Sequence, residues 1–314
     1  MDERLIARIE RTAGVAGLVE ALADRLSPTD LQSLLLAVHR RRVSRLTPAG
    51  VLAAYARNRF TAPSALDPLA LVTFDRLAFG VLAGLGFTGV ELSPVAPLGT
   101  VTAVATVDQT KVLSADRNCE VLSDSTNSLA LECAVRRQRL LRADPRSTER
   151  IRVFASHRLV RGQRFTAPGA SQHFRMLALT TAGRDEGSYR FQAETLVEQL
   201  DVLLRILAKA GWIRASVSLT DLSDGLRRPV LTEVLDFLAG RYPDVELGFD
   251  DARTTGRGYY TDACFHIHVG SSAGTRYEVG DGGFTTWTAQ LLGNAKERLL
   301  VSSLGTERLV GLAG

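Results

Sequence analysis

The 314-residue sequence predicts an α+β domain built on an antiparallel sheet, preceded by a small helical extension. Residues 150–165 and 174–183 are rich in β-branched and aromatic side chains and are separated by a short Pro- and Gly-containing loop, which is typical of a long hairpin. Residues 196–207 repeat leucine at helical spacing. Because strands and helices do not alternate regularly, a parallel sheet of βαβ units is not expected.

Residues 1–65 are expected to form the extension and its linker. From Leu5 to about Asn58 apolar residues recur every three or four positions, and Ser27-Pro28 is a typical helix start. Residues 60–68, FTAPSALDP, are rich in turn formers. The main domain is therefore expected over residues 66–314.

Within the main domain, Asp67-Pro68 predicts a helix that ends at Gly84 or Gly86, followed by the strand VELSPV at residues 90–95. Residues 100–134 alternate short β-branched runs with polar turns and are expected to form antiparallel hairpins. The other expected elements are a helix ending at Gly211, a helix from Pro229 to Gly240, a strand at residues 264–269 and a final helix at residues 306–314.

Composition limits the class of protein. The sequence has no uncharged apolar run long enough to cross a bilayer and no basic-then-apolar start typical of a signal peptide, so a cytoplasmic protein without a membrane partner is expected. Cys119, Cys133 and Cys264 are odd in number and far apart, which does not predict a disulfide framework or a structural zinc site.

The net charge of +4 is spread along the chain. Its densest basic cluster, HRRRVSR at residues 39–45, fits either the solvated face of a helix or a contact with a phosphate backbone. Basicity alone therefore does not predict a nucleic-acid partner.

Three segments in order resemble the motifs of class II aminoacyl-tRNA synthetases, particularly the histidyl type and its relative, the regulatory subunit of ATP phosphoribosyltransferase. The resemblance covers roughly residues 66–314. Its first segment, GLGF followed by VELSPV, resembles motif 1, a helix and a proline-bearing strand. This resemblance implies an antiparallel sheet flanked by helices and a two-fold homodimer through motif 1 around Pro94.

The second segment resembles motif 2. It consists of RVFASHRLVRGQRF, a loop, and QHF at residues 172–174. Arg161 matches the motif arginine, whose rigid fork is implied to hold the α-phosphate of ATP and a substrate carboxylate. Gln163 stands where the family has a glutamate that binds the adenine amino group. His173 takes the place of a basic residue at the outer phosphates, and Phe174 is implied to stack under the adenine.

The third segment, SSLGTERLVGL, resembles motif 3, and Arg308 matches the arginine that clamps the γ-phosphate. Arg161 and Arg308 are therefore the implied catalytic residues, which stabilise charge on the α-phosphate and on departing pyrophosphate. The resemblance implies ATP and Mg²⁺ as cofactors. Glu278 and Asp281 are the candidate metal ligands because they lie close to motif 3 in sequence.

The substrate-binding signatures of histidyl enzymes are altered. LSDSTNSLAL replaces the loop whose glutamate holds the substrate amine, and here Asp124 and Thr126 either bind an amine or form a polar turn between strands. TGRGYYT aligns Tyr259 and Tyr260 with the RGLDYY signature, while the family arginine falls on Thr255. Arg253 and Arg257 lie two residues to either side, and we take Arg257 with the two tyrosines as substrate-binding candidates.

Further along, GGFTTW from Gly282 replaces the GGRYD signature, so selectivity for histidine is not expected. Cys264, His266 and His268 fall on one face of a strand by their spacing of two. They fit pocket or core positions, with His266 a substrate-binding candidate, or a zinc site, although one straight strand rarely surrounds a tetrahedral ion.

Two functions remain open. One is an ATP-dependent ligase that adenylates an amino acid or related carboxylate for an acceptor that the sequence does not identify. The other is a non-catalytic regulatory or sensor subunit. Because the resemblance stops at motif 3 and has no counterpart of the anticodon-binding domain, standard tRNA charging is not expected.

Overall fold

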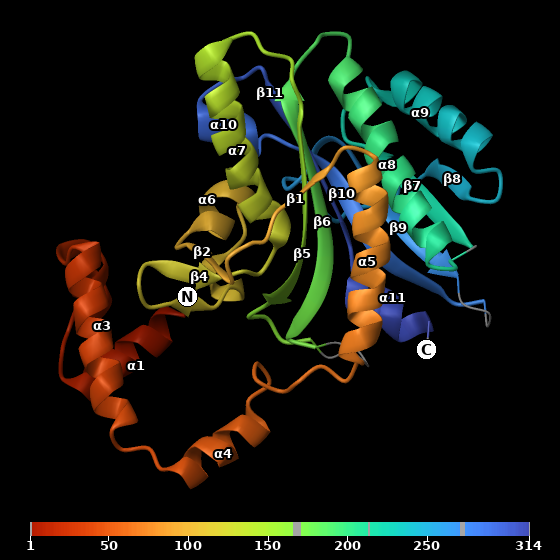
Figure 1. Cartoon of the computed structure of the whole chain (residues 1–314). Coiled ribbons are helices and arrows are strands. Elements are labelled where there is room, and N and C mark those ends of the chain that lie inside the picture. The colour runs from red at the N-terminus through yellow and green to blue at the C-terminus, as the bar shows by residue number, and fades with distance from the viewer. Residues whose placement is uncertain (1, 166–170, 213, 271–273, 314) are drawn as a thin grey trace.

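A computed structural model describes residues 2–165, 171–212, 214–270 and 274–313 (Figure 1). Within these residues an eight-stranded mixed sheet has the order β1-β5-β6-β11-β10-β9-β7-β8. Its strands are β1 (Thr88–Gly89), β5 (Ile151–Val160), β6 (His173–Arg184), β7 (Ala215–Asp221), β8 (Glu246–Phe249), β9 (Thr261–Gly270), β10 (Arg276–Thr285) and β11 (Glu297–Leu304). The pairs from β5 to β7 are antiparallel, which confirms the prediction, and only the edge strands β1 and β8 pair in parallel.

Helices cover both faces of this sheet (Figure 1). One face packs against α5 (Pro68–Gly84), α8 (Arg190–Lys209) and α11 (Thr306–Ala313), and α9 (Arg228–Arg241) lies beside α8. Apolar side chains such as Leu177, Leu200 and Phe265 form the core there. The other face packs against α7 (Ser125–Ala143), α10 (Trp287–Leu292) and α6 (Thr100–Ala105). We call this second face the site face.

The prediction of hairpins over residues 100–134 was wrong for most of that segment. It contains α6, the short 3₁₀ helix Gln109–Lys111 and the start of α7, and only β3 (Ser114–Ala115) and β4 (Cys119–Val121) form a hairpin, with β2 (Val95–Pro97) alongside. Val101 and Val104, three residues apart, are buried on one side of α6. Tertiary burial therefore overrides the strand preference of β-branched residues.

The strand expected at VELSPV is also shorter than predicted. Residues 90–94 lie between β1 and β2 and form neither strand. The backbone carbonyl of Pro94 accepts a hydrogen bond from the Leu122 N–H, 3.1 Å away, and the Pro94 side chain is exposed.

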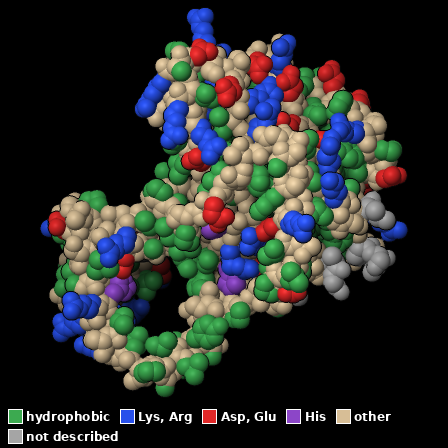
Figure 2. Space-filling view, in the orientation of Figure 1, with side chains coloured by type: hydrophobic (Ala, Val, Ile, Leu, Met, Phe, Trp, Pro, Cys, Tyr) green, Lys and Arg blue, Asp and Glu red, His purple; other side chains and the backbone are tan. Residues whose placement is uncertain are grey.

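The N-terminal extension is helical, as predicted. It contains α1 (Glu3–Ala13), α2 (Leu18–Glu20), a π-helical turn (Ala21–Arg25), α3 (Pro28–Val43) and α4 (Pro48–Arg57). None of the described residues 2–65 is buried. Figure 2 shows an opening between the extension and the main domain. His39 contacts Asp116 at 3.3 Å and Arg59 contacts the motif 2 segment, so the extension lies on the main domain through polar contacts. Among the described helices, none is long and apolar enough to cross a membrane.

Candidate functional site

The site face is divided into two halves of different chemistry. Under α7 the strands present apolar side chains, including Val153, Ala178 and Val301, and we call this the covered half. Toward the start of β6 and the end of β11 the face is polar. Register pairs Asp281 with Ser303 and with His266, and it pairs Glu278 with His268, so these five side chains share the face, which we call the open half.

Arg161 and Phe174 lie beside one another at the edge of the open half. Arg161 directly follows β5, and its Cζ is 5.0 Å from the centroid of the Phe174 ring. Its Nε donates to the backbone carbonyl of Ser123 at 3.3 Å. The motif 2 hairpin thus holds a cation against an aromatic face, and within the described residues the Nη groups of Arg161 have no hydrogen-bond partner and could bind an anion.

Gln163 follows Arg161 after a glycine that the fold requires. The Gly162 N–H donates to the Lys111 carbonyl at 2.7 Å, and a Cβ at position 162 would lie 2.9 Å from that carbonyl group. The Oε1 atom of Gln163 is buried and has no hydrogen-bond partner within the described part of the chain. An unpaired buried acceptor is costly, so this atom is suited to a ligand donor.

An ion pair joins Asp281 of the open half, which is half-buried, to the buried Arg253. Tyr260 Oη donates to Asp281 Oδ1 at 2.6 Å, and Arg253 Nη2 lies 3.3 Å from Asp281 Oδ2. Burial raises the pKa of Asp281, opposed by the Tyr260 hydrogen bond and by the charge of Arg253. Arg253 Nε donates to the Thr255 carbonyl at 3.0 Å, while its Nη1 is buried without a partner among the described residues.

Asp124, Thr126 and Tyr259 form the neighbouring wall. Asp124 is the N-cap of α7: its Oδ1 accepts hydrogen bonds from the Thr126 N–H at 2.9 Å and the Thr126 hydroxyl at 2.7 Å. Its Oδ2 lies 3.5 Å from the Tyr259 hydroxyl. Burial and, secondly, the charge of Asp124 raise the pKa of Tyr259. Asp124 therefore caps a helix and also directs one oxygen at a pocket tyrosine, so the alternative of a polar turn between strands does not hold.

The arginine in this pocket is Arg253. The Arg253 side chain is 3% exposed, whereas Arg257, our substrate-binding candidate, is exposed. Gly256 has a φ of +80°, and a Cβ there would lie 3.0 Å from the Tyr260 ring. This tight turn brings Arg253 back against Tyr260. In the sequence, Arg253 and Arg257 each lie two residues from the position of the family arginine, Thr255. Spacing alone therefore did not distinguish the two arginines.

His173 does not line the open half. Successive residues of a strand point to opposite faces, so His173 lies on the face away from Phe174. Its Nδ1 accepts from Arg158 Nη1 at 2.8 Å, since arginine can only donate, which leaves Nε2–H to donate to the Ala62 carbonyl. His173 and Arg158 line a cavity of about 490 Å³ under linker residues 61–72. The predicted contact of His173 with the outer phosphates is therefore not supported by its placement.

Arg308 lies at the same end of the sheet as Arg161. It is exposed, and its Nη1 donates to the Glu278 carbonyl at 2.6 Å. Since β6 lies between β5 and β11, the two motif arginines come from strand ends that flank β6. A negatively charged molecule on the open half would thus have a cation on either side of β6.

The predicted magnesium ligands do not form a pair. Both oxygens of Asp281 are engaged by Tyr260 and Arg253, and Glu278 Oε2 is 4.0 Å from His266 Nε2. No three His, Cys, Asp or Glu side chains of the described chain gather as a metal site. Burial raises the pKa of Cys264 to about 11, which favours a protonated thiol over a zinc ligand. These residues do not fit a two-carboxylate magnesium site or a zinc site.

Comparison with known proteins identifies the fold. No protein-family model matches the chain, and no curated protein does. A Bacillus halodurans structure described as an ATP phosphoribosyltransferase regulatory subunit/histidyl-tRNA synthetase matches with a TM-score of 0.62 and 13% identity, over 82% of this chain and 83% of that one. Apo histidyl-tRNA synthetase from S. aureus matches with a TM-score of 0.60 and 13% identity, over 81% and 69% of the two chains.

The chain has the class II synthetase catalytic-core fold. Pyrrolysyl-tRNA synthetase from Desulfitobacterium hafniense is also similar, with a TM-score of 0.50 and 14% identity over 78% of this chain and 69% of that one. The predicted resemblance to synthetases and to the regulatory subunit is thus confirmed as a likeness of fold.

Proposed function

We propose that the open half of the site face binds ATP, that the adjoining pocket binds an amino acid or related carboxylate, and that the protein joins the two as an acyl-adenylate. The observation that supports this most is a set of buried polar atoms without partners in the described chain. Gln163 Oε1 and Arg253 Nη1 both belong to it. The unpaired acceptor is complementary to an amino group such as that of adenine, and the unpaired cationic donor is complementary to a carboxylate.

ATP fits the motif 2 side of this site. The adenine would stack on Phe174 and donate its amino group to Gln163 Oε1, and Arg161, already 5.0 Å from the Phe174 ring centroid, would hold the α-phosphate. Arg308 would hold the outer phosphates beyond the end of β11. In this proposal Arg161 and Arg308, and not His173, would supply positive charge for the phosphates on this face.

The carboxylate substrate fits the pocket of Arg253. The free Nη1 of Arg253 would bind its carboxylate, and the Asp124 oxygen that faces Tyr259 would accept a hydrogen bond from an amine. A carboxylate oxygen then attacks the α-phosphorus, the bond from that phosphorus to the bridging oxygen breaks, and pyrophosphate leaves with the electron pair. Arg161 stabilises the charge on the α-phosphate as it builds up.

A regulatory or sensor subunit is the second candidate. The engaged oxygens of Asp281 favour it, because adenylation by the predicted pair of magnesium ligands would need them free. A neighbour of the same fold is itself described as a regulatory subunit/histidyl-tRNA synthetase. In this case the same pocket binds its ligands without turnover.

Pyrophosphate exchange dependent on each standard amino acid, together with ATP binding, distinguishes the two candidates. We expect exchange with one amino acid, lost in Arg161→Ala and Arg308→Ala and retained in Arg146→Ala, which changes an exposed arginine in the loop after α7. ATP binding without exchange would favour the sensor. Exchange that survives Arg161→Ala would contradict the proposed role of Arg161.

We further propose a homodimer through α5 and the segment around Pro94. Leu69 and Val72 on α5 are 70% and 58% exposed, which supports an interface on this helix. Sedimentation is expected to give a dimer for wild type and a monomer for Val72→Glu. Leu226→Glu changes a leucine that is 71% exposed on a separate loop and is expected to leave the dimer intact. A monomeric wild type would overturn this interface.

A further inference from the structure

A second pocket lies at the opposite end of the sheet from the open half. It is formed where β6 and β10 end and β9 and β11 begin, beside the first turn of α8, and encloses about 480 Å³. We call it the distal pocket. Its lining includes Tyr189, Gln192, Arg227, Asp262 and Thr285. Neither motif arginine contributes to this pocket, so it is separate from the proposed ATP site.

Buried polar atoms without partners gather around the distal pocket. Tyr189 Oη, Gln192 Oε1, Thr285 Oγ1 and Arg227 Nε are all buried, and none has a hydrogen-bond partner within the described residues. The first three side chains belong to residues that are 5%, 4% and 4% exposed. Because each unpaired buried polar atom costs stability, four around one cavity indicate groups that a ligand or water would satisfy.

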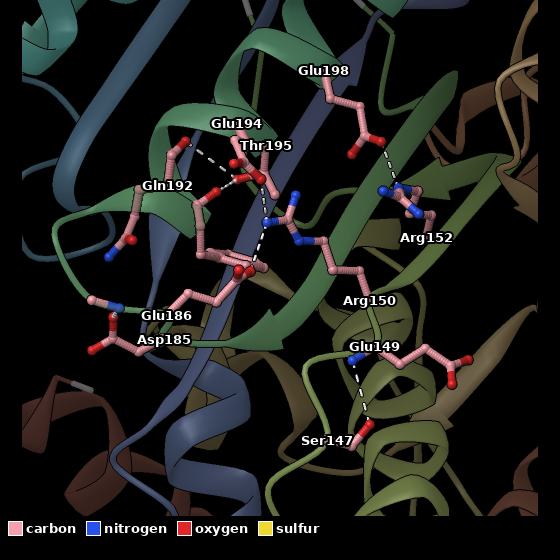
Figure 3. A network of polar contacts seen from close by, with 12 residues as sticks. Ser147, Glu149, Arg150, Arg152, Asp185, Glu186, Gln192, Glu194, Thr195 and Glu198 are labelled. Carbon is pink, nitrogen blue, oxygen red and sulfur yellow. Dashed lines mark hydrogen bonds and ion pairs between the residues drawn. The ribbon is translucent and has the colours of Figure 1, made fainter.

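The position of Gln192 on α8 supports this interpretation. Figure 3 shows its side chain directed away from the Arg150 cluster, on the side of the loop that carries Asp185. Arg150 itself is engaged by Glu186 at 2.7 Å and Glu194 at 2.6 Å. Gln192 therefore takes no part in the neighbouring ion-pair network and is free to bind a molecule in the distal pocket.

Two unpaired charges of opposite sign remain in the distal pocket. Other charged residues there are neutralised: Asp185 by Arg298 at 2.8 Å and Glu297 by a buried arginine at 2.7 Å. Within the described chain, Arg227 and Asp262 have no ion-pair partner, and Arg227 Cζ lies 4.7 Å from the centroid of the Tyr189 ring.

The N-terminus of α8 adds a partial positive charge beside the distal pocket. Tyr189 is the N-cap residue of this helix and supplies no side-chain hydrogen bond to its first turn. The Arg190 N–H already donates to the Gly187 carbonyl at 3.0 Å, and the helix dipole at this end favours an anionic group. Tyr189 and Ser188 have φ values of +60° and +49°, and Asp262 one of +59°, so the backbone that presents these residues occupies a sparsely populated region.

We propose that the distal pocket binds a free α-amino acid. Its carboxylate would lie between Arg227 and the first turn of α8, and its ammonium group would lie at Asp262. A simple anion would leave the Asp262 carboxylate unpaired and repelled, and a simple amine would leave Arg227 unpaired. A zwitterion satisfies both charges at once, and the hydroxyls of Tyr189 and Thr285 supply further hydrogen bonds.

Calorimetric titration of the full chain with each standard L-amino acid tests this proposal. We expect at least one to bind, and Arg227→Gln and Asp262→Asn each to weaken that binding by about tenfold or more, the loss typical of a hydrogen bond to a charged group. The methyl ester of the same amino acid is expected to lose affinity similarly. Arg228→Gln, which changes the adjacent, partly exposed arginine, is expected to leave binding unchanged.

Two results would overturn the proposal. One is the absence of binding by any amino acid, and the other is binding that Arg227→Gln and Asp262→Asn leave intact while Arg161→Ala or Arg253→Met removes it. If the charge variants fail to fold, Tyr189→Phe removes only one hydroxyl, and unchanged affinity in that variant would count against the pocket. If wild type shows no adenylation but its amino-acid binding is still weakened by Arg227→Gln, only the proposed function is overturned.

Discussion

The two halves of the site face use the same strands and differ in how they satisfy their polar groups. In the covered half, Arg137 is fully buried, yet its guanidinium binds both oxygens of Glu297 and the carbonyls of Ser147 and Glu149. Beside the open half, where it pairs with Asp281, Arg253 is almost as deeply buried but leaves Nη1 unpaired among the described residues. Complete pairing indicates a structural role, whereas incomplete pairing in a pocket indicates a ligand.

The largest expected effect is in the covered half. Arg137→Met is expected to lower the free energy of unfolding by about 3–5 kcal/mol, because it leaves the Glu297 carboxylate buried without a partner. Urea unfolding followed by circular dichroism measures this change. The double variant Arg137→Met/Glu297→Gln is expected to recover part of the loss, and a double variant no more stable than the single one would argue against the ion pair as its cause.

Phe174→Ala tests the open half of the site face. Phe174 is only partly buried, and we expect the variant to lose about 1–3 kcal/mol of ATP binding free energy, the usual contribution of a base stacked on an aromatic ring. Its free energy of unfolding is expected to change less than that of Leu129→Ala, which removes a fully buried side chain of α7 at a cost of about 2–5 kcal/mol. The reverse order of stability losses would contradict the division into two halves.

Cysteine reactivity is a milder probe of the same division. Burial raises the pKa of Cys133 in the covered half to about 12 and that of Cys264 to about 11. At pH 8 both thiols are therefore protonated, and only the partly exposed Cys119 is expected to react promptly with a disulfide reagent. Timed labelling and mass spectrometry check this order, and rapid labelling of Cys133 in the folded protein would show that α7 does not seal the covered half.

The smallest effect concerns pH. Because burial raises the folded-state pKa of Asp281 above its unfolded value, its contribution to stability is fully present below the ordinary Asp pKa and is lost as pH rises through the raised value. Over that window wild type is expected to lose stability relative to Asp281→Asn, which does not titrate. Urea unfolding of both proteins from pH 4 upward measures the difference, and a constant difference would show that Asp281 is not desolvated.

The sequence predicted the fold, because the fold depends on local pattern and on motifs in order, and the resemblance to motif 2 assigned Arg161 and Phe174 to the same ligand. It did not predict α6, where burial of Val101 and Val104 outweighs their strand preference. His173 and Phe174 are successive residues of one strand and point to opposite faces, which the alignment with the family motif did not take into account. The choice of Arg253 over Arg257 depends on the turn at Gly256.

Calorimetric titration of ATP into the full chain tests the account most directly. Wild type and the surface variant Arg146→Ala are expected to bind ATP equally, and Arg161→Ala is expected to bind about tenfold or more weakly, corresponding to the loss of a charge-assisted hydrogen bond. Equal binding by wild type and Arg161→Ala, or no binding by wild type, would contradict the assignment of the open half as a nucleotide site.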